Sequence, residues 1–212
     1  MTLGAGRLVA LEGVDGSGKS TQARRLAASL GATLTFEPGG TELGRALRRL
    51  LLEPGHPVPD VRAEALLMAA DRAQHVVEVI RPALDAGHLV VTDRFSGSTL
   101  AYQGFGRGLP LEELRPLVAW AARGLDADLN VVVDVPLPVA RVRLEHLAAD
   151  RLERLDEAFF SRVREGYLSL AASDPGRWVV VDGDGDVDAV AAAVLEVVAA
   201  HLDAVVSGDD RA

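Results

Sequence analysis

Residues 7–20 read RLVALEGVDGSGKS, and this stretch decides the fold class of the chain. The apolar run Arg7–Glu12 is typical of a buried strand, and a helical pattern begins at Lys19. The turn between them, Gly13–Ser20, fits the pattern G-x-x-x-x-G-K-[ST] in the strand–turn–helix context that the pattern requires. We therefore expect a phosphate-binding loop, the alternative being a glycine-rich turn without a ligand.

The chemistry of this loop predicts ATP and Mg²⁺ as ligands. Its glycines let backbone N–H groups wrap around phosphate oxygens, and the start of the following helix adds partial positive charge. Lys19 would reach the β- and γ-phosphates, and the Ser20 hydroxyl would bind Mg²⁺. Lys19 is the only lysine of the chain, which indicates a site where a planar guanidinium cannot replace an ammonium. The predicted nucleotide-binding residues are Gly13, Val14, Asp15, Gly16, Ser17, Gly18, Lys19, Ser20 and Thr21.

Length and composition narrow the class of protein. The chain has 212 residues, which suits one domain over residues 1–212. Its net charge of −9 argues against a nucleic-acid partner. The absence of cysteine excludes disulfides and thiolate metal sites, and it fits a cytoplasmic protein. No apolar stretch is long enough for a membrane span, so we expect no membrane partner.

Valine- and leucine-rich strands alternate with helical segments along the chain. This alternation predicts an α/β fold with a parallel sheet that is covered by helices on both faces. The predicted strands are Arg7–Glu12, Thr33–Phe36, His88–Asp93, Leu129–Val135 and Trp178–Asp182. The predicted helices are Lys19–Leu30, one capped by Thr41 and ending near Leu52, Asp60–Asp85 with a bend at Pro82, Ser96–Gln103, Leu111–Arg123, Pro138–Leu147, Asp156–Ala172 and Val187–Val206.

Several motifs together resemble the thymidylate kinase family, with matching order and spacing over about residues 7–182. The motifs are Glu12–Thr21, Glu37–Thr41, Ala70–His75, Asp93–Phe95, Ser98–Gly104, Gly106–Gly108 and Asp150–Glu153. The resemblance implies a three-layer P-loop fold with a five-stranded parallel sheet, a small lid and a homodimer. It also implies transfer of the γ-phosphoryl group of ATP to dTMP, giving dTDP for dTTP biosynthesis. The acceptor phosphate is mostly dianionic at neutral pH, so no general base is required.

The resemblance also implies roles for residues near the transferred group. Arg94 would contact the donor and acceptor phosphates together, and Asp15 would contact the 3′-hydroxyl of the acceptor sugar or a magnesium-bound water. Asp93 would lie on the magnesium side, although a plain strand-end cap is the alternative. Arg151 would close onto ATP from a lid at about residues 141–157. The arginines of this lid are Arg141, Arg143, Arg151 and Arg154, and a solvent-facing charged helix explains them nearly as well.

A second group of residues matches the family's acceptor site. Arg48 and Arg72 match positions that contact the acceptor phosphate and the thymine edge, with solvated helix faces as the alternative. Thr99 and Gln103 match positions that read or position the base, and Tyr102 matches one that lies against the sugar, unless it is a core tyrosine. The whole predicted acceptor set is Asp15, Glu37, Pro38, Arg48, Met68, Arg72, Arg94, Thr99, Tyr102 and Gln103.

The sequence departs from the family pattern at a few positions. Met68 stands where a phenylalanine usually stacks on thymine, and Phe36 replaces an arginine before Glu37. Gly16 stands where one subgroup carries an arginine, and residues 144–149 lack lid arginines. These departures keep two other functions open, a nucleoside-monophosphate kinase with another base preference and an ATP-binding module without activity. A third class, an ATPase that acts with nucleic acid, is disfavoured by the acidic composition.

Overall fold

A five-stranded sheet forms the centre of the molecule in the computed structural model, which describes residues 6–145 and 156–209. Its strands are β1 (Arg7–Glu12), β2 (Thr33–Phe36), β3 (Leu89–Asp93), β4 (Leu129–Asp134) and β5 (Trp178–Asp182). They lie in the order β2-β3-β1-β4-β5, and all neighbouring pairs are parallel. The predicted strands are confirmed, with β3 beginning and β4 ending one residue inside the expected bounds.

Helices follow the strands in the alternation that the sequence predicts. They are α1 (Lys19–Leu30), α2 (Glu42–Leu52), α3 (Val61–His75), η1 (Val76–Ile80), α4 (Arg81–Asp85), α5 (Ser96–Thr99), η2 (Leu100–Gly106), α6 (Leu111–Ala121), α7 (Leu137–Leu144), α8 (Glu157–Ser173) and α9 (Val187–Asp209). Local caps explain two of the starts, because the side chains of Thr41 and Asp60 accept backbone N–H groups at the beginnings of α2 and α3.

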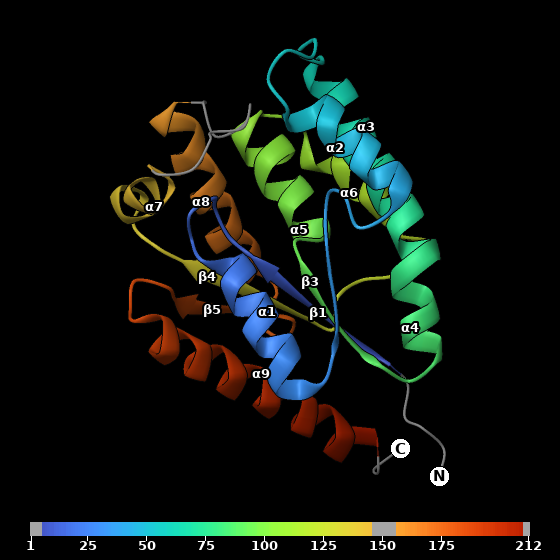
Figure 1. Cartoon of the computed structure of the whole chain (residues 1–212), viewed down its shortest axis with the longest axis vertical. Helices are drawn as coiled ribbons and strands as arrows, with labels where there is room; N and C mark the ends of the chain where they lie inside the picture. Colours follow the sequence, from blue (N-terminus) through green and yellow to red (C-terminus); the bar gives the residue numbers. More distant parts are fainter. Residues whose placement is uncertain (1–5, 146–155, 210–212) are drawn as a thin grey trace.

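The molecule has three layers because side chains alternate across each buried strand. Val9 and Leu11 of β1 pack in a core with α1 and α9, whereas Leu8 and Ala10 pack on the opposite face against η1 and α4. Figure 1 shows α1 and α9 together on one side of the sheet, with α3, α4, α5, α6 and α8 on the other. The predicted fold class, a parallel sheet flanked by helices on both faces, is confirmed.

The long helix expected over Asp60–Asp85 differs from the prediction at its irregular point. The structure has a π-helical segment, η1, that ends two residues before Pro82, where the sequence predicts a bend. Pro82 lacks an N–H group, and its ring would clash with the carbonyl four residues earlier. The Arg81 N–H therefore donates to the carbonyl of Val76, five residues earlier, and the chain gains the extra residue of a π turn.

The carboxyl ends of the strands β1, β2 and β3 meet at one edge of the sheet. Asp93 is paired with Leu11 of β1 and with Phe36 of β2, so the loops after these three strands lie side by side. Ligands of open α/β sheets bind at such edges. No helix within residues 6–145 and 156–209 is long and apolar enough to cross a membrane.

Candidate active site

A cleft of about 870 Å³ opens at this edge of the sheet. Every residue of the predicted acceptor set lines it, together with much of the phosphate loop. The lining residues that the sequence had singled out are Asp15, Gly16, Gly18, Lys19, Ser20, Thr21, Phe36, Glu37, Pro38, Arg48, Met68, Arg72, Asp93, Arg94, Thr99, Tyr102, Gln103 and Arg143. The remaining predicted loop residues, Gly13, Val14 and Ser17, are buried behind this lining, and Arg151 lies outside the described residues.

The loop between β1 and α1 has the backbone geometry that glycine permits. Gly16 has a φ of 81° and Gly18 a φ of 93°, both in the left-handed region that other residues rarely adopt. Gly16 also has no room for a side chain, since a Cβ there would lie 2.3 Å from the carbonyl oxygen of Ala140 in α7. The loop therefore packs directly against α7 and runs into α1 at Lys19.

Lys19 is almost fully buried at the start of α1. Its ammonium donates to the carbonyl oxygen of Val14 at 3.3 Å and to Asp15 Oδ1 at 3.4 Å. Burial and the neighbouring Arg94 guanidinium lower the pKa of Lys19, while Asp15 raises it in part. An anion that enters the loop would stabilise the ammonium form, so this position is built to receive negative charge.

Asp15 joins the loop to the acceptor side of the cleft. Arg94 Nη2 donates to Asp15 Oδ1 at 2.5 Å, and the Tyr102 hydroxyl donates to Asp15 Oδ2 at 2.8 Å. Burial alone would raise the pKa of the Asp15 carboxyl, but the Arg94 guanidinium and the Lys19 ammonium lower it well below its usual range. The carboxylate is therefore ionised at neutral pH and balances two cations.

Arg94 lies at the centre of the cleft, directly after β3. Its guanidinium lies over the Tyr102 ring, 4.8 Å from the ring centroid, and Nη1 donates to the carbonyl oxygen of Gly13 at 3.1 Å. Nη1 also contacts the Ser98 and Tyr167 hydroxyls, each at 3.0 Å. The guanidinium is therefore held in position from several sides of the cleft.

Arg72 approaches the cleft from α3 and is buried rather than on a solvated helix face. Its Nε donates to Glu37 Oε2 and its Nη1 to the Thr99 hydroxyl, both at 2.9 Å. Its Nη2 donates to the carbonyl oxygen of Phe95. His75 Nδ1 lies 2.9 Å from Glu37 Oε1, so the carboxylate is held between a guanidinium and an imidazole.

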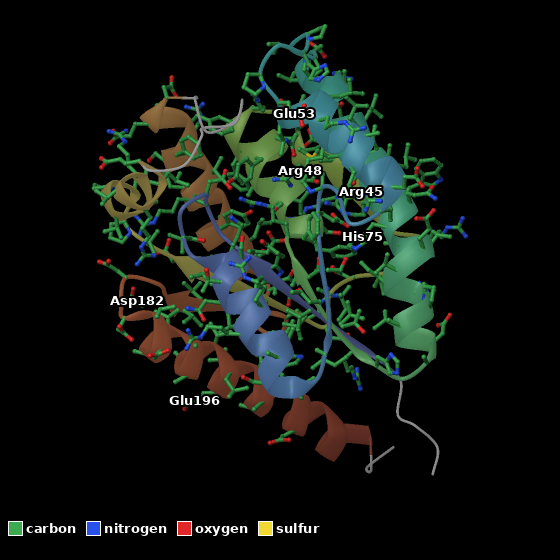
Figure 2. The ribbon with its side chains drawn as sticks, in the orientation of Figure 1. Arg45, Arg48, Glu53, His75, Asp182 and Glu196 are labelled. Atoms are coloured by element: carbon green, nitrogen blue, oxygen red, sulfur yellow. The ribbon has the colours of Figure 1, made fainter. Side chains whose placement is uncertain are left out.

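The loop after β2 carries the outer wall of the cleft. The Glu37–Pro38 peptide bond is cis, and Arg48 Nη1 of α2 donates to the carbonyl oxygen of Pro38 at 2.9 Å. Phe36 lies beside this loop with 44 % of its surface exposed. Figure 2 shows Arg48 and His75 on the α2–α3 side of the molecule, far from Asp182 at the end of β5.

The end of the cleft that resembles a base site combines apolar and amide groups. Met68 is half-buried and packs against the core cluster that contains Leu52 and Tyr102. Gln103 is buried, and its Nε2 donates to Glu64 Oε1 at 3.0 Å. Arg107 also pairs with Glu64, so the orientation of the Gln103 amide is held from outside the cleft.

Asp93 and Ser20 are the residues that could hold a magnesium ion. Among the described residues, no group donates to the buried Asp93 Oδ1, an orphan that a cation or its water could satisfy. The described residues contain no cluster of three or more potential metal ligands. Mg²⁺ commonly binds through one or two protein oxygens and substrate phosphates, so this sparse set fits the ion.

A further arginine, Arg143 of α7, reaches the loop from the opposite side. It donates to the carbonyl oxygen of Ser17 at 3.2 Å and to that of Gly183 at 3.0 Å. The sequence had favoured Arg151 among the lid arginines, whose position lies outside the described residues. In the structure, Arg143 is the lid arginine that lines the cleft within the described part of the chain.

The comparisons with known proteins agree with this geometry. A family model described as thymidylate kinase matches residues 11–194. The chain belongs to the thymidylate kinase family. Thymidylate kinase from Desulforudis audaxviator is 45 % identical over 93 % of this chain and 92 % of its own length. Thymidylate kinase from Bifidobacterium longum is 49 % identical over 89 % of this chain and 95 % of its own length. The crystal structure of thymidylate kinase from Ehrlichia chaffeensis has a TM-score of 0.76 at 31 % identity and covers 91 % of this chain and 97 % of that chain.

Within this member of the thymidylate kinase family, sequence reasoning missed residues that support the cleft from behind. Glu12, Ser98 and His75 lie inside motifs that the sequence displays, but the motifs assign them no role. Tyr167 lies alone on α8 with no motif around it. One signal could have identified it: the chain has only two tyrosines, and both hydroxyls contact Arg94.

Proposed function

We propose that this protein catalyses ATP-dependent phosphorylation of dTMP to dTDP. The observation that carries the proposal is the position of the Arg94 guanidinium, which contacts Gly13 in the phosphate loop and Tyr102 on the opposite wall of the same cleft. A group in that position can contact a donor phosphate in the loop and an acceptor phosphate across from it. Family membership supports the choice of ATP and dTMP.

The chain's residues would act mainly by position and charge. The phosphate loop and Lys19 hold the donor, Arg48 and Arg72 hold the acceptor, and Arg94 neutralises charge that spreads over the transferring group. The acceptor phosphate attacks as a dianion, so the cleft needs no general base. Asp15 pairs with Lys19 and Arg94. On substrate binding these two cations would bind phosphates instead of Asp15, and the carboxylate would turn towards the sugar hydroxyl.

Mg²⁺ is part of the proposal. Bound Mg²⁺ would neutralise phosphate charge during transfer. The Ser20 hydroxyl and the Asp93 carboxylate would hold it, because Ser20 lies in the first turn of α1 at the cleft and Asp93 Oδ1 has no hydrogen-bond partner among the described residues. Ser20→Ala should raise the Mg²⁺ concentration required for half-maximal rate.

The donor side would be completed by a lid over about residues 141–157 within a single domain. Arg143 supports this assignment because it already lies beside the phosphate loop, where its guanidinium can approach ATP. Arg151 remains a second candidate for the arginine that closes onto ATP. Closure would exclude water from the transferring group, which limits hydrolysis of ATP in the absence of dTMP.

A comparison of acceptors tests the proposal. ADP formation from Mg·ATP is measured with dTMP, dUMP, UMP, CMP and AMP as acceptors, for the wild-type chain and for Met68→Phe. We expect dTMP to give the highest kcat/KM, and a stacked phenylalanine should lower KM for dTMP by about 3- to 10-fold. Preference for a purine acceptor, or ATP binding without ADP release for any acceptor, would overturn the assignment.

Arg94→Ala tests the mechanism separately from the base preference. We expect kcat to fall by about 100- to 1,000-fold, because the variant loses a preorganised cation at the transferring group. Circular dichroism and thermal melting should show an intact fold. Near-normal turnover in a folded Arg94→Ala variant would show that the reacting phosphates lie elsewhere.

The protein is further proposed to act as a homodimer. Two contacting helices carry apolar side chains outward at helical spacing: Leu43 and Leu50 on α2, and Leu66 and Ala70 on α3. Trp120 of α6, a helix that also packs on α3, is 80 % exposed. Exposed apolar side chains gathered on adjacent helices are typical of an interface between copies.

A further inference from the structure

Glu12 is a fully buried carboxylate at the end of β1, one residue before the phosphate loop. A buried ionisable group is unfavourable unless its oxygens are hydrogen-bonded, so its partners indicate what it does. Burial raises the pKa of the Glu12 carboxyl, while Ser98, Arg94 and the Phe95 N–H lower it in part. The group faces no other carboxylate among these contacts.

The hydrogen bonds of its carboxylate among the described residues lead to the turn after Arg94 and to α8. Oε1 accepts the backbone N–H groups of Phe95 at 3.0 Å and Ser98 at 3.2 Å. Oε2 accepts from the Ser98 hydroxyl at 2.6 Å and the Tyr167 hydroxyl at 3.1 Å. The turn lies so close to the Glu12 carboxylate that a Cβ on Gly97 would lie 2.8 Å from Oε1.

The turn needs such support because Arg94 has an unfavourable backbone conformation. Its φ is 73°, in the left-handed region where non-glycine residues with long side chains are uncommon. A conformation of this kind persists only where surrounding contacts impose it. Glu12 accepts the N–H of Phe95, which follows Arg94 directly, and the N–H of Ser98 at the other end of the turn, so it holds the chain in the direction that this conformation produces.

The same carboxylate is linked to the Arg94 guanidinium through two hydroxyls. The hydroxyls of Ser98 and Tyr167 contact Glu12 Oε2, and each also accepts from Arg94 Nη1 at 3.0 Å. The structure therefore connects Glu12 to both the backbone and the side chain of Arg94, with no direct hydrogen bond between Glu12 and the guanidinium among the described contacts.

We propose that Glu12 is a positioning residue for phosphoryl transfer, which holds the Arg94 guanidinium across the phosphate loop by fixing the turn Phe95–Ser98 and the Tyr167 hydroxyl. The proposal rests on the proposed function, in which Arg94 contacts both phosphates. Glu12 would not touch either substrate. Its loss should therefore act through Arg94 on kcat, with little change in KM for ATP.

A double-mutant cycle tests this coupling. Glu12→Ala should lower kcat about 10- to 100-fold by letting the guanidinium move. In the Arg94→Ala background the same substitution should have little further effect on kcat, because both act through one group. Glu12→Gln should restore most of the activity, since its amide oxygen can still accept from Phe95 and Ser98. Additive losses, or no rescue by glutamine, would overturn the proposal.

Tyr167→Phe keeps the test decisive if Glu12→Ala fails to fold. It removes only the bridging hydroxyl, and it should lower kcat several-fold in the wild-type background but not in Arg94→Ala. Asp128→Ala is the matched control, because Asp128 Oδ2 accepts the Leu8 N–H at the other end of β1. It should lower stability and leave kcat unchanged, and an equal loss of kcat would mean that Glu12 is merely structural.

The outcomes separate this inference from the proposed function. If Arg94→Ala abolishes turnover while Glu12→Ala and Tyr167→Phe retain wild-type kcat, only the positioning role is lost. If Arg94→Ala itself retains normal turnover, the proposed site is wrong, and the coupling to Glu12 falls with it.

Discussion

At the scale of single residues, opposite charges are already paired in the cleft. The Asp15 carboxylate lies 3.4 Å from the Lys19 ammonium and 2.5 Å from the Arg94 guanidinium. These are the two cations that the proposed reaction assigns to phosphates. The carboxylate holds both cations beside the same space, so the site is organised around negative charge.

Lys19→Arg tests whether the single lysine is required. The Lys19 ammonium is buried against the Val14 carbonyl, and a planar guanidinium on a longer side chain cannot reproduce this compact donor at the same place. We expect kcat to fall about 100-fold or more, as steady-state ADP formation would show. Arg25→Lys, a conservative change on the exposed side of α1 and outside the cleft lining, is the control. Full activity of Lys19→Arg would show that the lysine carries no special role.

Asp71 should make stability depend on pH. Burial and the nearby Glu37 raise the pKa of Asp71 from 3.8 to about 6, although His75, Arg72 and the Gly39 N–H lower it in part. A raised pKa means that folding favours the protonated form. The stability that this provides is present below pH 3.8 and is lost as pH rises through about 6.

The variant Asp71→Asn removes this dependence while Oδ1 can still accept from Gly39. The variant should be more stable than the wild-type chain. The difference between their unfolding free energies should increase by about 2 kcal/mol from roughly pH 4.5 to 7.5. Urea unfolding at the two pH values measures the difference. A gain that is the same at both would contradict the assignment of a raised pKa.

At the scale of elements, the contact between the phosphate loop and α7 limits what the loop can carry. Gly16 has a positive φ, and the Ala140 carbonyl oxygen lies where its side chain would start. An arginine at this position, as one subgroup of the family has, would need a different approach of α7. The position of α7 therefore excludes a side chain at Gly16 in this chain.

Gly16→Ala should be more harmful than its backbone angle alone predicts. Gly31→Ala is the matched control, since Gly31 has a similar φ of 63° but nothing within 4 Å of the place that a Cβ would take. We expect a loss of about 1 kcal/mol in unfolding free energy for the control. The loss for Gly16→Ala should be about 3 kcal/mol, with a higher KM for ATP. Equal losses in urea unfolding would argue against a steric contact with α7.

At the scale of the whole molecule, the proposed dimer face lies on helices that also build the acceptor side. Leu66 is 57 % exposed on α3, the helix that carries Met68 and Arg72 into the cleft. Association through this face would hold α3 against a second copy. The acceptor site would then be supported from both sides of one helix.

Leu66→Arg should disrupt the proposed dimer. A charge in the centre of an apolar interface is unfavourable, and we expect the dissociation constant to rise about 100-fold or more. Light scattering over a range of concentrations measures it. Val58→Arg is the control, because Val58 is 73 % exposed in the loop between α2 and α3, outside the proposed face. A wild-type chain that is monomeric at micromolar concentration would refute the dimer itself.

The sequence by itself determined the parallel sheet, the phosphate loop and the family, because buried parallel strands are read from local apolar runs and the loop from contiguous residues. The tertiary structure alone decided how the supporting groups meet. Arg72 is buried against Glu37 and Thr99, and Tyr167 reaches Arg94 from α8, although these partners lie far apart in the chain. Local patterns place a residue on an element, but only the packing of elements brings distant side chains within hydrogen-bonding distance.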